Sequence, residues 1–211
     1  MTEPEIWGEA HAGDPHALAV VALHGRTQDV PFVRGLSERL GVAGLRWFAP
    51  EAEGNSWYPH PFLDPSPENA EHLARALDVA ESSIATARAA GFARVAVLGF
   101  SQGACTLAHL LLTREVAVEG AVLFTGGYVG ADPLDPAVVA EARARVGVPV
   151  LLRSIDRDPW VPAHRVADTA RLLVLAGAQV DALIEPGDEH GITDRAAADA
   201  RELLETLKES A

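Results

Sequence analysis

The chain is poor in several features that would each place it in a particular class of protein. Only one of its 211 residues is cysteine, which excludes an internal disulfide framework. Cationic side chains are also scarce, because 17 Lys and Arg stand against 30 Asp and Glu, giving a formal net charge of −13. Nucleic acids and anionic membranes are polyanions, so this charge argues against both as partners. No uninterrupted apolar run approaches the roughly 18 residues of a membrane span, so stable membrane insertion is not expected.

The beginning and the length of the chain set further expectations. Residues 1–5, MTEPE, lack the basic start and apolar segment of a secretory signal peptide, so a cytoplasmic location is the default expectation. A chain of 211 residues suits one well-buried domain and is short for two. Neither internal repeats nor a linker interrupt it, and we expect residues 1–211 to form a single domain. Monomer and homodimer both stay open.

Short apolar runs alternate with segments of helical periodicity along the whole chain. The apolar runs predict buried strands at residues 17–23, 45–49, 94–98, 121–124, 148–152 and 180–184. Near the start of the chain, residues 6–7 predict at most an edge strand. Capping residues and helical spacing predict helices that begin near Asp29, Ser66, Ala104, Asp135, Ala163 and Thr193. Strands that alternate with helices predict an α/β fold, in which a mostly parallel central sheet carries helices on both faces.

The sequence Gly-Phe-Ser-Gln-Gly at residues 99–103 joins the strand at 94–98 to the helix that begins near Ala104. A strand that ends in GxSxG and continues at once as a helix is typical of a nucleophile elbow. The glycines let the backbone bend sharply enough to present the serine hydroxyl. Ser101 is therefore the candidate nucleophile.

A serine nucleophile needs a base to accept its proton and an acid to orient that base. In the α/β-hydrolase arrangement the acid and then the histidine follow the serine, on loops at the carboxyl ends of later strands. Of the eight histidines, only His190 lies between the last predicted strand and the last predicted helix, which makes it the candidate general base. The loop after the preceding strand carries Asp156 and Asp158. We favour Asp158 as the partner of the histidine and expect Asp156 to be structural.

Acyl transfer passes through a tetrahedral oxyanion, which preorganised N–H donors must stabilise. One donor is expected from the backbone N–H of Gln102, directly after the nucleophile. The second is expected from the loop after the first core strand, where Arg26 is the best-placed residue. The Arg26 guanidinium has two further interpretations, contact with a substrate carboxylate or phosphate, or simple exposure at the surface.

Several aromatic residues lie on or beside the loops that carry these groups and are candidates to line a substrate pocket. They are Trp57, Tyr58, Phe100, Tyr128 and Trp160. For each of them ordinary packing is an equally good interpretation. The loops over residues 51–67 and 126–136 determine the shape of the pocket, and neither has a pattern that fixes its path.

The remaining residues of possible chemical interest have structural interpretations. His24 is expected to organise its loop through hydrogen bonds, and Cys105 is expected to be a small buried residue of its helix. The other histidines show no metal-ligand spacing, so no metal site is predicted.

Five short blocks follow one another between residues 23 and 190. They read LHG at 23–25, SWY at 56–58, GFSQG at 99–103, DPxVP at 158–162 and PGxxH at 186–190. Together they resemble the phospholipase/carboxylesterase family of small serine α/β-hydrolases, which includes acyl-protein thioesterases. The resemblance implies an enzyme with little or no lid and with neither metal nor organic cofactor, acting on carboxylic esters or thioesters. It carries the catalytic roles to Ser101, Asp158 and His190, and the oxyanion donors to Arg26 and Gln102.

The chain departs from that family in the loop expected to form the oxyanion site. Many relatives have a second glycine where this chain has Thr27. Because threonine tolerates positive φ poorly, we expect the loop to take a different turn here.

The sequence thus predicts a serine carboxylesterase that hydrolyses small-molecule esters through an acyl-enzyme intermediate. An acyl thioesterase or a lysophospholipase is the alternative among enzymes. A non-catalytic binding protein on a hydrolase fold is the alternative of another class. Candidates for all three catalytic roles are present, which argues against it.

Overall fold

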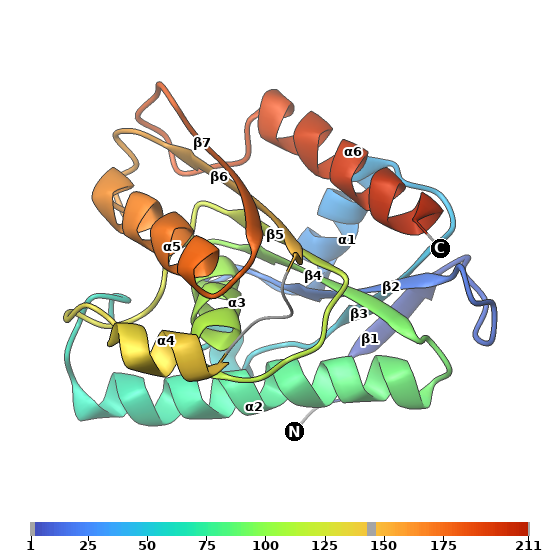
Figure 1. Cartoon of the computed structure of the whole chain (residues 1–211), viewed down its shortest axis with the longest axis horizontal. Coiled ribbons are helices and arrows are strands. Elements are labelled where there is room, and N and C mark those ends of the chain that lie inside the picture. The colour runs from blue at the N-terminus through green and yellow to red at the C-terminus, as the bar shows by residue number, and fades with distance from the viewer. Residues whose placement is uncertain (1–2, 143–146, 211) are drawn as a thin grey trace.

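The computed structural model describes residues 3–142 and 147–210, and in this part the chain forms a seven-stranded sheet with helices on both faces (Figure 1). The strands are β1 (Glu5–Gly8), β2 (Leu18–Leu23), β3 (Leu45–Ala49), β4 (Arg94–Phe100), β5 (Gly120–Phe124), β6 (Pro149–Ile155) and β7 (Gln179–Glu185). They lie in the order β1-β3-β2-β4-β5-β6-β7, and every pair is parallel except β1 with β3. The predicted fold class is confirmed.

The helices form two layers, one on each face of the sheet. They are α1 (Val30–Leu40), α2 (Pro67–Ala89), α3 (Gln102–Thr113), α4 (Pro136–Ala142), α5 (Ala163–Leu175) and α6 (Asp194–Glu209). Helices α1 and α6 pack together on one face, and α2, α3 and α5 cover the other (Figure 1). No helix in the described ranges is long and apolar enough to cross a membrane.

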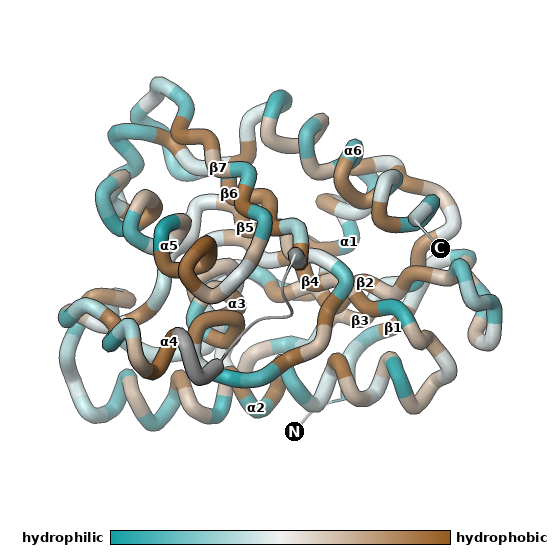
Figure 2. The backbone as a smooth tube through the Cα atoms, in the orientation of Figure 1, coloured by the Kyte–Doolittle hydropathy of each residue, from teal (hydrophilic) through white to brown (hydrophobic). Residues whose placement is uncertain are grey.

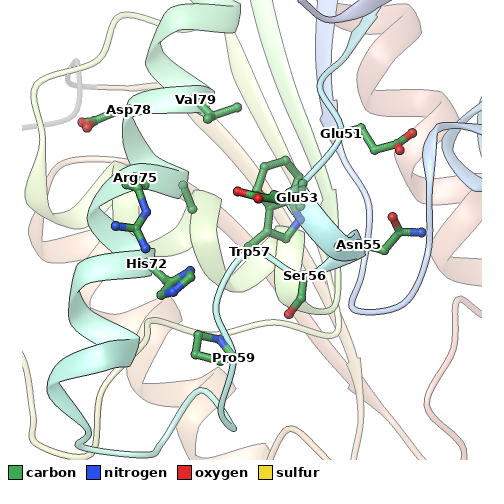
Figure 3. A pocket seen from close by; sticks show the side chains of 13 residues that line it. Glu51, Glu53, Asn55, Ser56, Trp57, Pro59, His72, Arg75, Asp78 and Val79 are labelled. Atoms are coloured by element: carbon green, nitrogen blue, oxygen red, sulfur yellow. The ribbon is translucent and has the colours of Figure 1, made fainter. Parts of the chain in front are cut away.

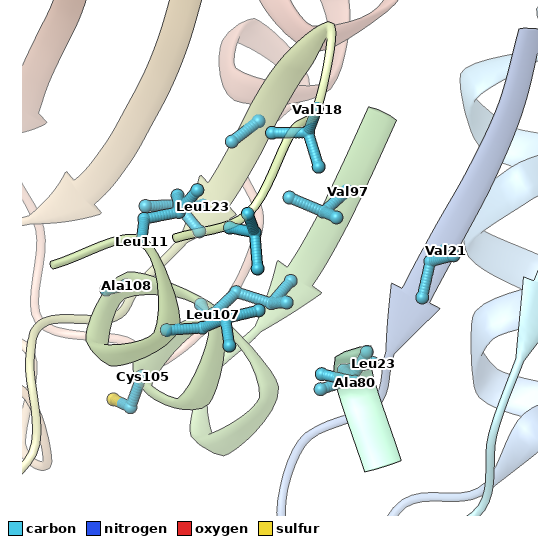
Figure 4. Close-up of a cluster of buried hydrophobic side chains, with 14 of the residues drawn as sticks. Val21, Leu23, Ala80, Val97, Cys105, Leu107, Ala108, Leu111, Val118 and Leu123 are labelled. Atoms are coloured by element: carbon cyan, nitrogen blue, oxygen red, sulfur yellow. The ribbon is translucent and has the colours of Figure 1, made fainter. Parts of the chain in front are cut away.

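Strand β2 explains why both faces must be covered. All six of its residues are buried, and successive side chains of a strand point to opposite faces. Val21 and Leu23 therefore join the core cluster beneath α2 and α3, whereas Leu18 and Val20 join the cluster beneath α1 and α6. Figure 2 shows the hydrophobic residues concentrated on the central strands. Figure 4 shows the apolar face of α3 packed against β4 and β5.

Three helices begin at the residues that the sequence predicts. The side chain of Asp29 accepts a hydrogen bond from the amide of Phe32, and Ser66 and Thr193 cap α2 and α6 in the same way. The predicted loop over residues 51–67 is not wholly irregular, since it contains a short 3₁₀ helix, η1 (Glu53–Asn55). A single turn with left-handed residues inside it has no periodic pattern, so nothing in the sequence indicates it.

Candidate active site

Ser101 lies where β4 ends and α3 begins. Its backbone has φ 53° and ψ −117°, and a positive φ is uncommon for any residue other than glycine. The turn leaves no space for larger neighbours, because a Cβ on Gly103 would lie 2.3 Å from the carbonyl oxygen of Leu23. A Cβ on Gly99 would lie 2.6 Å from the amide nitrogen of Ala104. The two glycines of the motif therefore let α3 start against the ends of the two central strands.

This packing makes Gly103→Ala a test of the elbow. The new methyl group would meet backbone atoms of β2, which have no rotamer to change, so we expect a loss of about 1–3 kcal/mol in the free energy of unfolding. Gly35→Ala in α1 is the matched control, because a Cβ there would meet nothing within 4 Å and alanine favours helix. Urea titration of both variants gives the comparison. A Gly103→Ala protein as stable as Gly35→Ala would contradict this account of the turn.

Three polar side chains from separate loops meet at the carboxyl ends of β4, β6 and β7. His190 Nε2 lies 2.7 Å from Ser101 Oγ, and His190 Nδ1 lies 2.7 Å from Asp158 Oδ2. The structure thus brings together the three residues that the sequence singled out, although they are up to 89 positions apart. A hydroxyl, an imidazole and a carboxylate in one hydrogen-bonded series can move a proton from the hydroxyl to the imidazole.

The environment of Asp158 keeps it ionised. Its side chain is fully buried, and its Oδ1 accepts backbone N–H groups from Trp160 at 2.8 Å and Val161 at 2.9 Å. Burial by itself would raise the pKa of this carboxyl, but the hydrogen bonds from His190, Val161 and Trp160 lower the pKa below its usual value. A carboxylate with only acceptor oxygens requires the proton of the imidazole to be on Nδ1. Nε2 is then free to accept the hydroxyl proton of Ser101.

Asp156 plays a different part in the same loop. Its Oδ1 accepts the backbone N–H of Gly187 at 2.9 Å, and its Oδ2 lies 3.3 Å from a guanidinium nitrogen of Arg157. It therefore joins the loop after β6 to the loop after β7, without contact to His190. This agrees with the structural role expected from the sequence.

The loop after β2 lies beside Ser101, since a Cβ on Gly25 would be 3.1 Å from the Ser101 Cβ, and it has one unused backbone N–H. The amide of Gly25 donates to Gln28 Oε1 at 2.9 Å, and the amide of Thr27 donates to the carbonyl of Asn55 at 2.8 Å. Between them the N–H of Arg26 has no acceptor within the described residues, and the same holds for the N–H of Gln102 at the start of α3. These are the two groups predicted as oxyanion donors, and that role stays a prediction.

Thr27 does not avoid the left-handed region. Its φ is +61°, a conformation that threonine adopts poorly. The hydrogen bond from its amide to Asn55 holds the residue there, as surrounding structure must do for any strained backbone. That the loop turns differently from that of its relatives stays a prediction.

His24 organises the same loop, as the sequence predicts. It is completely buried, its Nε2 accepts the amide of Ala52 at 3.1 Å, and its Nδ1 lies 2.7 Å from the carbonyl of Gly25. Burial lowers the pKa of His24, so the ring is neutral and donates from Nδ1. Its backbone carbonyl also accepts the indole N–H of Trp57 at 2.8 Å. The prediction of a hydrogen-bonding role is confirmed.

Of the aromatic pocket candidates, Phe100 and Trp160 lie beside the hydrogen-bonded group of Ser101, His190 and Asp158. The ring of Phe100 is 5.3 Å from that of His190, and Trp160 is 70% exposed next to Asp158. Trp57 instead lines a cavity of about 810 Å³ between residues 51–59 and α2 (Figure 3). No residue of the Ser–His–Asp group lines that cavity. A substrate-binding role for any of these side chains stays a prediction.

Tyr58 and Tyr128 are at most 2% exposed and belong to the core beneath α3. Tyr58 lies beside Cys105, which is also buried. Burial raises the pKa of the Cys105 thiol to about 11, so almost none of it is thiolate at neutral pH. The structure therefore gives Cys105 no role as a nucleophile.

Arg165 in α5 is a residue that the sequence did not bring to attention. Although 5% exposed, it donates to the carbonyls of Tyr128, Gly130 and Ala131, and so fixes the loop after β5. Its guanidinium also lies 4.0 Å from the centre of the Tyr128 ring. The one available signal was its position next to Val166, on the side of α5 that faces the core.

These features together define an α/β hydrolase: a mostly parallel sheet, a strained serine between strand and helix, and a histidine on the loop after the last strand. Among the described residues, no group of three or more His, Cys, Asp and Glu is arranged to hold a metal ion. The sequence model of the Phospholipase/Carboxylesterase family matches residues 49–208, and the chain belongs to this family. A search of curated proteins gave no significant match.

Solved structures agree with this assignment. The chain is similar to the phospholipase/carboxylesterase from Dyadobacter fermentans, with 28% identity and a TM-score of 0.84 over 96% of this chain and 97% of that one. It is also similar to the Bacillus cereus carboxylesterase, with 19% identity and a TM-score of 0.76 over 96% and 93%. SOBER1 from Arabidopsis thaliana has 17% identity and a TM-score of 0.77 over 90% and 99%. The last two are similar in fold alone.

Proposed function

We propose that this hydrolase is a serine carboxylesterase with Ser101 as nucleophile, His190 as general base and Asp158 as the acid that orients His190. The observation that carries the proposal is the series of two 2.7 Å hydrogen bonds from Ser101 Oγ through His190 to Asp158. The strained backbone of Ser101 supports it, since such strain is typical of active sites. The proposed substrate is a small-molecule carboxylic ester. This choice is consistent with the strongly acidic chain, which disfavours polyanionic partners such as nucleic acid.

In the acylation step, Ser101 Oγ attacks the carbonyl carbon of the ester while His190 Nε2 accepts the hydroxyl proton. The carbonyl oxygen becomes an oxyanion and accepts hydrogen bonds from the backbone N–H groups of Arg26 and Gln102. Each such donor contributes about 3–4 kcal/mol to the stabilisation of the transition state. The intermediate collapses as the C–O bond to the alcohol breaks, and His190 gives its proton to the departing alkoxide. Asp158 stabilises the imidazolium that exists between these two transfers.

In the deacylation step, His190 accepts a proton from water as the water oxygen attacks the acyl-enzyme. A second oxyanion forms at the same two donors. It collapses to release the carboxylic acid, and His190 returns the proton to Ser101 Oγ. Every proton in the cycle passes through Nε2 of one residue, so the scheme needs no cofactor.

The proposal is tested by active-site labelling together with turnover. We expect a fluorophosphonate probe to label the folded chain once, at the peptide that contains Ser101, and to abolish hydrolysis of a p-nitrophenyl short-chain ester in parallel. Heat-denatured protein is the control, because an unassisted serine is not nucleophilic. Labelling without ester turnover, or turnover that survives full labelling, would contradict the proposal. Rates for a matched ester and thioester, and for short and long acyl chains, separate the carboxylesterase from a thioesterase or lysophospholipase.

A further inference from the structure

The Arg26 guanidinium is hydrogen-bonded to the backbone of a neighbouring loop. Its Nη1 donates to the carbonyl of Pro59 at 2.6 Å, and its Nη2 donates to the carbonyls of Tyr58 at 3.0 Å and His60 at 2.6 Å. The guanidinium carbon also lies 5.9 Å from the centre of the Tyr58 ring. Neither interpretation from the sequence, an anion-binding or a simply exposed side chain, describes this arrangement.

The same loop is also held by Gln102. Its Oε1 accepts the amide of Trp57 at 2.9 Å, and its Nε2 donates to the carbonyl of Tyr58 at 2.7 Å. The carbonyl of Tyr58 is therefore an acceptor shared by Arg26 and Gln102. We name residues 56–60 the brace. The two residues with the unused N–H groups thus both bind the brace through their side chains.

A backbone contact next to the brace completes the connection. The amide of Thr27 donates to the carbonyl of Asn55, directly before the brace, while Thr27 keeps a φ of +61°. A non-glycine residue in the left-handed region is strained and persists only where its surroundings determine it. The loop from Gly25 to Thr27 therefore depends for its shape on contacts with residues 55–60, and three of those contacts belong to the Arg26 guanidinium.

We propose that Arg26 is a positioning residue, whose guanidinium fixes its own backbone N–H at the oxyanion site by binding the brace that Gln102 also binds. The inference rests on the proposed esterase function. A change of the Arg26 side chain leaves the N–H present but removes the contacts that set its direction. Since oxyanion donors act by preorganisation, the loss must appear in the transition state rather than in substrate binding.

The test uses the full chain with Arg26→Ala and Arg26→Lys. We expect Arg26→Ala to lower kcat for a p-nitrophenyl ester by about 10- to 100-fold, less than the loss of a whole donor, with KM changed less than about threefold. Affinity for a trifluoromethyl ketone, which forms a tetrahedral adduct with the serine, should fall by the same factor as kcat. Millimolar guanidinium chloride should restore part of the activity of Arg26→Ala. Arg26→Lys should lie between, because an ammonium group has no planar fork for three carbonyls.

Arg46→Ala is the matched control, since Arg46 also donates to a backbone carbonyl, that of Gly8 at 2.7 Å, but near the start of β3. It should leave kcat and the adduct affinity unchanged. The proposal is overturned if Arg26→Ala keeps kcat within twofold of wild type, or if its loss only follows a smaller folded fraction in thermal melts. Should Arg26→Ala fail to fold, Arg26→Lys carries the same comparison. A wild-type protein that neither labels at Ser101 nor turns over esters contradicts the proposed function instead.

Discussion

Ser101→Ala should lower kcat for ester hydrolysis by about 10⁵- to 10⁶-fold, because no other group in the site can form the acyl-enzyme. The thiol of Cys105 is buried and its pKa is about 11, so it offers no substitute. Any remaining rate would come from direct attack of water with the two N–H donors still in place. The measurement is steady-state turnover of a p-nitrophenyl ester together with fluorophosphonate labelling, which should be absent.

Controls for this variant concern the fold. Alanine keeps the strained backbone at position 101 and removes only the hydroxyl that bonds His190. The free energy of unfolding should therefore change by about 1 kcal/mol or less. Ser82→Ala, at an exposed position in α2, should match wild type in both turnover and labelling. A Ser101→Ala protein that keeps more than one percent of wild-type turnover, after repurification, would remove Ser101 from the mechanism.

Much of the scaffold could be predicted because its signals are local. Asp29, Ser66 and Thr193 each accept a hydrogen bond from the amide three residues further on. Their capping role can therefore be predicted from a stretch of four residues. Buried strands such as β2 can be predicted from their apolar runs, because a strand covered on both faces must be apolar throughout. The approach of Ser101, Asp158 and His190 follows from topology, since loops at the carboxyl ends of parallel strands lie at one edge of the sheet.

The missed features depend on contacts between distant segments. Nothing within a few residues of Arg26 indicates that its side chain will bind carbonyls more than 30 positions away. The positive φ of Thr27 is contrary to its local preference and is held by Asn55. In the same way Arg165 is a charged residue in a core that periodicity would reserve for apolar ones. Local rules failed where tertiary hydrogen bonds outweigh local preference.

Asp158→Asn should lower kcat by about 10⁴-fold while leaving the geometry of the site nearly intact. The two backbone N–H groups of Trp160 and Val161 point at Oδ1, so the oxygen of the new amide must face them. The amide NH₂ then faces His190 Nδ1, which can only accept a hydrogen bond from it. The proton of the neutral imidazole is forced onto Nε2, where it blocks transfer from Ser101.

The acid-dependence of folding gives this variant a second readout. The pKa of Asp158 is below its usual value in the folded protein, so its ionised form stabilises the fold at pH values above about 4, its range in an unfolded chain. That contribution is lost as the pH falls through the folded-state pKa. The difference in unfolding free energy between wild type and Asp158→Asn should therefore shrink on acidification over this range.

Asp156→Asn is the matched control for both measurements. It changes the same kind of group two positions away, on a side chain that holds Gly187 and makes no contact with His190. We expect it to lower kcat less than about fivefold, because an amide oxygen at this position still accepts the N–H of Gly187. If Asp156→Asn proved the more damaging of the two substitutions, the carboxylate that serves His190 would have to be reassigned. The 2.7 Å contact between His190 and Asp158 would then be structural.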